Sequence, residues 1–156
     1  MLWLAAASTG LAQNARPADE PLTGLRPLNA REGREIARAT IGKEDDDGGQ
    51  ADCSHLVHDL YEQLGFAYPY ASSLDLYNGS EGFVRMRAPQ PGDLIVWRGH
   101  VGIVVDPKKH SFFSSTSSGV RAADYDSDYW RARGRPRFYR YLIDSQERPL
   151  GAAPEI

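Results

Sequence analysis

The chain has 156 residues, of which 41% are hydrophobic and 25% are charged, a composition typical of one globular domain. Eighteen basic against 21 acidic residues give a net charge of -3, which argues against a nucleic-acid binder that depends on phosphate contacts. Cys53 is the single cysteine, so an internal disulfide framework and a multi-cysteine zinc site are excluded. No stretch reaches the ~20 apolar residues of a membrane-spanning helix, and we expect no integral membrane segment.

Residues 1–12 are uncharged and end in Gly10-Leu11-Ala12, a small-x-small pattern that signal peptidases accept. They predict a signal peptide and export to the periplasm or the extracellular space. No Lys or Arg precedes the apolar run, so a buried N-terminal helix is the alternative. Residues 13–28 hold three prolines without periodicity and predict a linker. In an exported protein, an unpaired cysteine tends to be kept for chemistry.

Two helices are expected next. Asn29 is a good N-cap for a helix from Ala30 to about Thr40. After it comes an acidic loop, 43–50, which we interpret as solvent-exposed rather than as a calcium site, because its aspartates are consecutive. Asp52 is a plausible N-cap for a second helix, Cys53 to Leu64, which ends before Gly65.

A helical wheel divides the second helix into two faces. Cys53 falls on the inward stripe, whose other members are Leu56, Val57, Leu60 and Leu64. His55 and His58 fall on the outward face, away from the thiol. Although Cys-x-His-x-x-His resembles a metal motif, this geometry argues against zinc, and we expect neither a metal nor a cofactor.

The remainder of the chain predicts a β-rich half. A loop-rich passage, 66–92, contains one short helix at about 73–77. Strands are expected at 94–97 and 100–105, joined by a two-residue turn, and then at 111–115, 119–122 and 137–143. The tail 144–156 is expected to be flexible. The spacing of Tyr125, Tyr129 and Trp130 suits one packed face of a short helix within 125–133.

One cysteine–histidine pair is the candidate for chemistry. A cysteine at a helix N-terminus faces the positive end of the helix dipole, which favours the thiolate, but it still needs a base from another element. His55 and His58 point away, and His110 stands beside two lysines in a turn. His100 opens a strand at the rim of the sheet and is the best partner by elimination. A structural cysteine and a surface histidine are the alternative.

Two linked motifs resemble those of the NlpC/P60 family of cysteine peptidases. The first is Asp52-Cys53-Ser54 before an apolar helix, and the second runs from Pro91-Gly92-Asp93-Leu94 to His100-Val101-Gly102-Ile103. The resemblance spans about residues 30–142 and implies a papain-like α+β domain, 29–143, with N-terminal helices packed on an antiparallel sheet of about five strands. It further implies hydrolysis of amide bonds in the stem peptides of bacterial peptidoglycan.

The resemblance also assigns roles to individual residues. Cys53 becomes the nucleophile, His100 the base, and Ser114 the third residue, which orients His100; Ser115 is the alternative if the strand register differs by one. Residues assigned to substrate binding are Asp52, Ser54, Ser72, Ser73 and Arg121. For four of these positions ordinary explanations compete: Asp52 is a helix cap, Ser72 and Ser73 are turn residues, and Arg121 is the fourth. For Arg121, an exposed strand arginine is the more ordinary explanation than a contact with a substrate carboxylate.

The chain departs from the family pattern at three places. The third residue is a serine where the family commonly has histidine, and a hydroxyl adds no charge to stabilise the imidazolium. The stretch 41–45 lacks the tyrosine that helps many members to stabilise the oxyanion, and His55 replaces a usual glycine. Two alternatives therefore stay open: an amidase or acyl transferase on the same fold, and a degenerate domain that binds stem peptides without cutting them.

Overall fold

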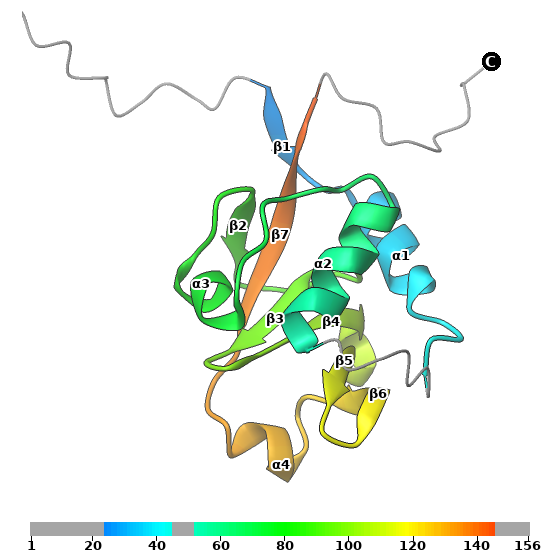
Figure 1. The fold of residues 1–156 in the computed structure, drawn as a ribbon, viewed down its shortest axis with the longest axis vertical. Helices are drawn as coiled ribbons and strands as arrows, with labels where there is room; N and C mark the ends of the chain where they lie inside the picture. The colour runs from blue at the N-terminus through cyan, green and yellow to red at the C-terminus, as the bar shows by residue number, and fades with distance from the viewer. Residues whose placement is uncertain (1–23, 45–51, 146–156) are drawn as a thin grey trace, which may run out of the picture.

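The computed structural model describes residues 24–44 and 52–145 (Figure 1). The predicted signal peptide, most of the predicted linker and acidic loop, and the tail beyond Ser145 lie outside these residues. The elements in chain order are β1 (Leu25–Pro27), α1 (Ala30–Ala39), α2 (Cys53–Gln63), α3 (Ser73–Asn78), β2 (Phe83–Met86), β3 (Leu94–Trp97), β4 (His100–Asp106), η1 (Pro107–Lys109), β5 (Ser111–Thr116), β6 (Gly119–Asp124), α4 (Asp128–Arg131) and β7 (Arg137–Asp144). Within the described ranges, no helix has the length and apolarity that crossing a bilayer requires.

The strands within residues 24–44 and 52–145 form one antiparallel sheet of seven strands instead of about five. Its order is β1-β7-β3-β4-β5-β6, and β2 also pairs with β7. The long strand β7 runs through the molecule, with β1 beside its far end (Figure 1). The two additional strands, β1 and β2, lie in the predicted linker and in the predicted loop passage. With three and four residues they are too short to show alternation, and pairing with β7 defines them.

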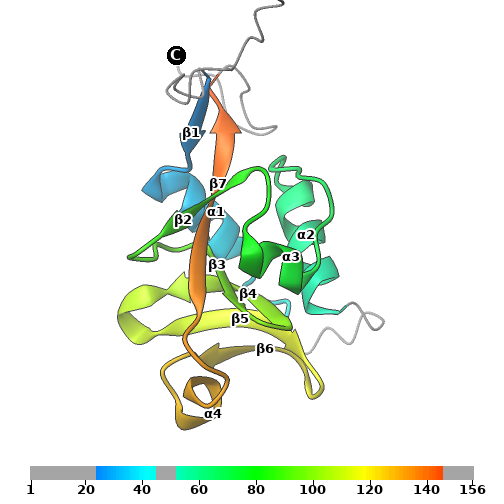
Figure 2. The ribbon, with the colours of Figure 1, turned by 90° about the vertical axis from the view of Figure 1, so that its left-hand side faces the viewer.

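Helices cover both faces of the sheet. On one face, which we call the helix face, α1, α2 and α3 pack over a core that includes Leu94 and Val96 of β3. On the other, the α4 face, Ile95 and Trp97 of the same strand pack with Trp130 of α4. All four residues of β3 are buried because both of its faces are covered. Figure 2 shows α4 at the end of the molecule opposite β1.

The loop before β3 fixes α1 to the sheet. Gly92 has φ +87°, and a Cβ built there would lie 2.3 Å from the carbonyl oxygen of Gly33 in α1. Only glycine tolerates both this conformation and this contact. Next to it, the buried carboxylate of Asp93 accepts two hydrogen bonds from Arg140 of β7, each 2.9 Å long. Tyr61 of α2 donates to the carbonyl of Gly92, so the loop joins α1, α2 and β7.

Candidate active site

Helix α2 begins at Cys53, as the sequence predicts. Asp52 is the N-cap, and its Oδ1 accepts a hydrogen bond of 2.9 Å from the backbone N–H of His55. That bond is the main reason why the pKa of Asp52 lies below its usual value. Cys53 is half-buried and has a free thiol at the first position of the helix. The positive end of the helix dipole therefore faces the sulfur.

The buried face of α2 differs from the one predicted by the helical wheel. Its buried residues are Ser54, Val57, Leu60 and Tyr61, while Leu56 and Leu64 are half-buried but, as predicted, pack against the core. The face is rotated because Tyr61 packs its ring into the core and bonds to Gly92. Ser54, assigned above to substrate binding, is 5% exposed and lies on this inward side.

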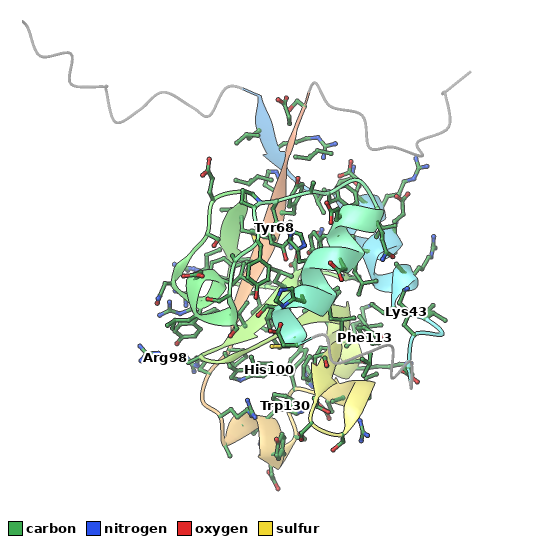
Figure 3. All side chains as sticks on the ribbon, in the orientation of Figure 1. Lys43, Tyr68, Arg98, His100, Phe113 and Trp130 are labelled. Carbon is green, nitrogen blue, oxygen red and sulfur yellow. The ribbon has the colours of Figure 1, made fainter. Side chains whose placement is uncertain are left out.

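His100 opens β4 directly after the Arg98-Gly99 turn, opposite Trp97 of β3. The residue is 6% exposed, and its Nε2 lies 2.9 Å from the Oγ of Ser114, which is itself buried. The ring of Trp130 lies beside that of His100, with the two ring centroids 4.8 Å apart. Both residues are labelled in Figure 3. Ser114, rather than its neighbour Ser115, is therefore the hydroxyl that holds the imidazole.

The surroundings of His100 keep its imidazole neutral. Burial, and to a smaller extent the nearby charge of Arg133, lower the pKa of His100 from 6.5 to about 4. Both causes act against the protonated ring, since burial removes water from the cation and Arg133 repels it. At neutral pH the imidazole can therefore accept a proton.

Cys53 and His100 line one open cavity of about 420 Å³. Its other described lining residues are Asp52, Gly99, Ser115, Thr116, Ser117, Tyr129, Trp130 and Arg133. Across the described part of the chain, no hydrogen bond joins the Cys53 sulfur to a ring nitrogen of His100. We call this hollow the Cys53–His100 cavity.

The sequence-predicted substrate residues Ser72, Ser73 and Arg121 are not among the described residues that line this cavity. Ser72 caps α3 and bonds to Asp75, and Ser73 is the first residue of that helix. Arg121 lies on β6 and donates a hydrogen bond to the backbone carbonyl of Ser118. None of these three is among the described residues that line the Cys53–His100 cavity, whereas Asp52 is.

Sequence reasoning missed the aromatic and cationic wall of the cavity. Tyr125, Tyr129 and Trp130 do not share one packed face: Trp130 is buried, but Tyr129 is 65% exposed. The guanidinium of Arg133 stacks on Trp130 and Tyr129, with its Cζ 5.0 and 5.7 Å from the two ring centroids. Tyr129, Trp130 and Arg133 line the cavity because α4 and the turn after it pack beside His100. No local pattern in the sequence predicts this packing.

The two histidines of α2 are engaged away from the thiol. His55 is exposed and stacks on Tyr70 at a centroid distance of 4.4 Å. His58 lies 3.0 Å from the backbone oxygen of Tyr68 through Nε2. The ligand atoms of His58, Asp59 and Glu62 lie within 4.8 Å of one another, but the two carboxylates are exposed, and exposed acidic groups are common without a metal.

Comparison with known proteins identifies the class of protein. A model of the NlpC/P60 family matches residues 39–135, which hold α2, β3, β4, β5 and α4. The chain belongs to the NlpC/P60 family. Its helices on an antiparallel sheet agree with the α+β fold of that family, and the family supports a hydrolase of cell-wall peptides in general terms. A search of curated proteins found no match.

Proposed function

We propose that the protein is a cysteine peptidase that hydrolyses amide bonds in the stem peptides of peptidoglycan. One observation supports this most directly: the half-buried thiol at the start of α2 and an imidazole bonded to Ser114 line the same open cavity. Membership of the NlpC/P60 family supports peptidoglycan-related substrates.

His100 acts as the general base in this proposal. Because its pKa is about 4, the ring is neutral at pH 7 and accepts the proton of Cys53 as the sulfur attacks the amide carbonyl. The imidazolium then gives that proton to the departing amine. Water hydrolyses the thioester with His100 again acting as the base.

The hydroxyl of Ser114 can accept the hydrogen bond of the His100 tautomer that this chemistry requires. For Nδ1 to accept a proton, Nε2 must carry one, and Nε2–H then donates to the Oγ of Ser114. The hydroxyl orients the ring but adds no negative charge, and Arg133 opposes the imidazolium. The protonated intermediate is therefore less stabilised than it would be beside a carboxylate.

The oxyanion and the substrate carboxylate need donors in the same cavity. The backbone N–H of Cys53, at the N-terminus of α2, is the first oxyanion donor. We assign the substrate carboxylate to Arg133, which lines the cavity, rather than to Arg121 on β6. A guanidinium held on two rings is well placed for such a pair because stacking restricts its movement.

The proposed setting is the bacterial envelope. An exported enzyme reaches peptidoglycan directly, and the small-x-small pattern at residues 10–12 is the sequence feature that supports export. Mass spectrometry of the N-terminus of protein recovered from the secreted or periplasmic fraction tests this. A mature chain beginning near Gln13 is expected, whereas protein confined to the cytoplasm would contradict export.

Digestion of purified peptidoglycan, with mass spectrometry of the fragments, tests the function itself. The wild-type protein is expected to release fragments with a newly exposed amine inside the stem peptide, and Cys53→Ala is the matched control. Release of stem peptides from the glycan, or transfer of an acyl group, would favour the amidase or acyl transferase alternative. Binding to peptidoglycan without any fragment, equal in both proteins, would favour the degenerate domain.

A further inference from the structure

A second hollow lies beside β2 and the start of β7, separate from the Cys53–His100 cavity. Its volume is about 670 Å³. Four of its described lining residues are arginines: Arg85, Arg87, Arg135 and Arg137. The other described lining residues are Met86, Pro136 and Phe138. We call it the arginine groove.

Most of the charge in the arginine groove is uncompensated. Arg85, Arg87 and Arg135 are exposed and form no ion pair with any acidic side chain in the described ranges. Arg137 donates a hydrogen bond of 2.8 Å to the backbone oxygen of Tyr77 and stacks 4.0 Å from the centroid of its ring. A chain with a net charge of -3 thus gathers four cations in one hollow without an acidic residue in the described lining.

The basic surface continues beyond the groove. The guanidinium of Arg98 lies 5.4 Å from the centroid of the same Tyr77 ring, and Figure 3 shows Arg98 at the outside of the molecule. Arg133, two residues before Arg135, lines the Cys53–His100 cavity. Neighbouring positions of the turn after α4 therefore contribute to both hollows.

Clustered guanidinium groups repel one another, and an anion that several of them can bind relieves this repulsion. Arginine matches phosphate especially well, because its planar fork donates two parallel hydrogen bonds. We infer that the arginine groove binds a linear phosphodiester polymer without aromatic bases, of the poly(glycerol phosphate) type. This goes beyond the proposed peptidase activity and does not depend on it.

Two other phosphate-bearing partners fit less well. Membrane surfaces are bound by basic residues together with apolar side chains that enter the bilayer. Within the described ranges, none of the exposed large hydrophobic residues, Leu25, Ile41, Tyr70, Leu74 and Tyr129, lines the groove. Single-stranded nucleic acids are bound through stacking on aromatic rings. The only aromatic among the described lining residues is Phe138, which packs with Tyr125 in the α4-face core.

The test measures binding of fluorescently labelled poly(glycerol phosphate) to the full chain by anisotropy, between about 50 and 200 mM salt. The groove variant is Arg85→Gln/Arg87→Gln/Arg135→Gln. The control is Arg31→Gln/Arg34→Gln/Arg38→Gln, which removes the same charge from exposed positions on α1. All variants are first checked for an unchanged melting temperature and circular dichroism spectrum.

For three contacts to a flexible strand, log K of the wild-type protein should fall against log salt with a slope of about -2. The groove variant is expected to bind about tenfold or more weakly and to lose most of this slope. The α1 control should stay within about threefold of the wild type, since it loses only the long-range effect of the same charge.

Four results would overturn the inference: no binding by the wild type, equal losses in both triple variants, tighter binding to anionic lipid vesicles, or tighter binding to a single-stranded oligonucleotide. The Cys53→Ala variant should bind the polymer as the wild type does. Conversely, the groove variant should hydrolyse a short soluble stem peptide at the wild-type rate. The two proposals can therefore fail independently.

Discussion

The two faces of the sheet are built in different ways. Among the described residues, the helix face holds sixteen buried residues in one cluster, which come from three helices, the strands and the segments that connect them. The α4 face holds five: Ile95, Trp97, Val104, Phe112 and Trp130. Cys53 belongs to the first face through α2, and His100 packs with the aromatic residues of the second. The larger core carries the main hydrophobic stabilisation, and the smaller aromatic layer determines the surroundings of the base.

This difference implies that stability and chemistry can be changed separately. A substitution that loosens the packing of α1 and α2 should unfold the whole domain. A substitution near His100 on the α4 face should alter the base while the domain remains folded.

The largest expected effect comes from the nucleophile. Cys53→Ala should lower kcat for a stem-peptide substrate by about 10⁴-fold or more, because the covalent step is lost. The melting temperature should change little, since Cys53 is only half-buried at the end of a helix. Cys53→Ser is a second check, and residual activity near the wild-type level in either variant would remove Cys53 from the reaction.

The next effect concerns stability on the helix face. Asp93→Ala leaves Arg140 without its partner in a largely buried site, which should cost about 3–5 kcal/mol in the free energy of unfolding. Urea denaturation monitored by tryptophan fluorescence measures it. The control is Asp93→Leu/Arg140→Met, which removes both charges and should recover part of the loss. A change below about 1 kcal/mol in Asp93→Ala would show that the pair does not hold the loop to β7.

A smaller effect is expected at Ser114, on the α4 face. Ser114→Ala removes the group that holds Nε2 of His100, and kcat should fall about tenfold while the protein stays folded. Nitrogen NMR of labelled histidine should show a mixture of His100 tautomers in this variant and one in the wild type. Ser118→Ala, at an exposed position in the turn before β6, is the control. An unchanged tautomer in Ser114→Ala would contradict the positioning role.

Local signals in the sequence predicted most of the frame around the site. The N-caps Asn29 and Asp52 and the start of α2 depend on neighbours within one helical turn, and the structure confirms them. The continuous apolar run of β3 and its two-residue turn also predicted the hairpin that presents His100. These features can be predicted from the sequence because the interactions that form them join residues close together in the chain.

The features that the sequence did not predict depend on distant partners. The rotation of α2 arises from Tyr61, whose hydroxyl finds the carbonyl of Gly92, 31 residues away. Strands β1 and β2 exist through pairing with β7, and Arg133 reaches the cavity because α4 packs Trp130 against Trp97. None of these contacts leaves a periodic pattern in the chain.

The smallest expected effect concerns Arg133 and the pKa of His100. In the wild type, kcat/KM should fall as the pH decreases through about 4, because protonated His100 is no longer a base. Arg133→Gln removes the repulsion that opposes the protonated ring, so this pKa should rise and the acid limb of the profile should move to higher pH. Burial is the larger cause of the shift and persists, so the limb should stay below the ordinary value of 6.5.

Arg131→Gln is the matched control, since Arg131 pairs with Asp126 and is not among the described lining residues of the cavity. Because Arg133 is also assigned to the substrate carboxylate, KM above pH 7 should rise in Arg133→Gln and not in Arg131→Gln. An acid limb that moves equally in both variants would mean that general surface charge, rather than the cation stacked beside Trp130, acts on the base.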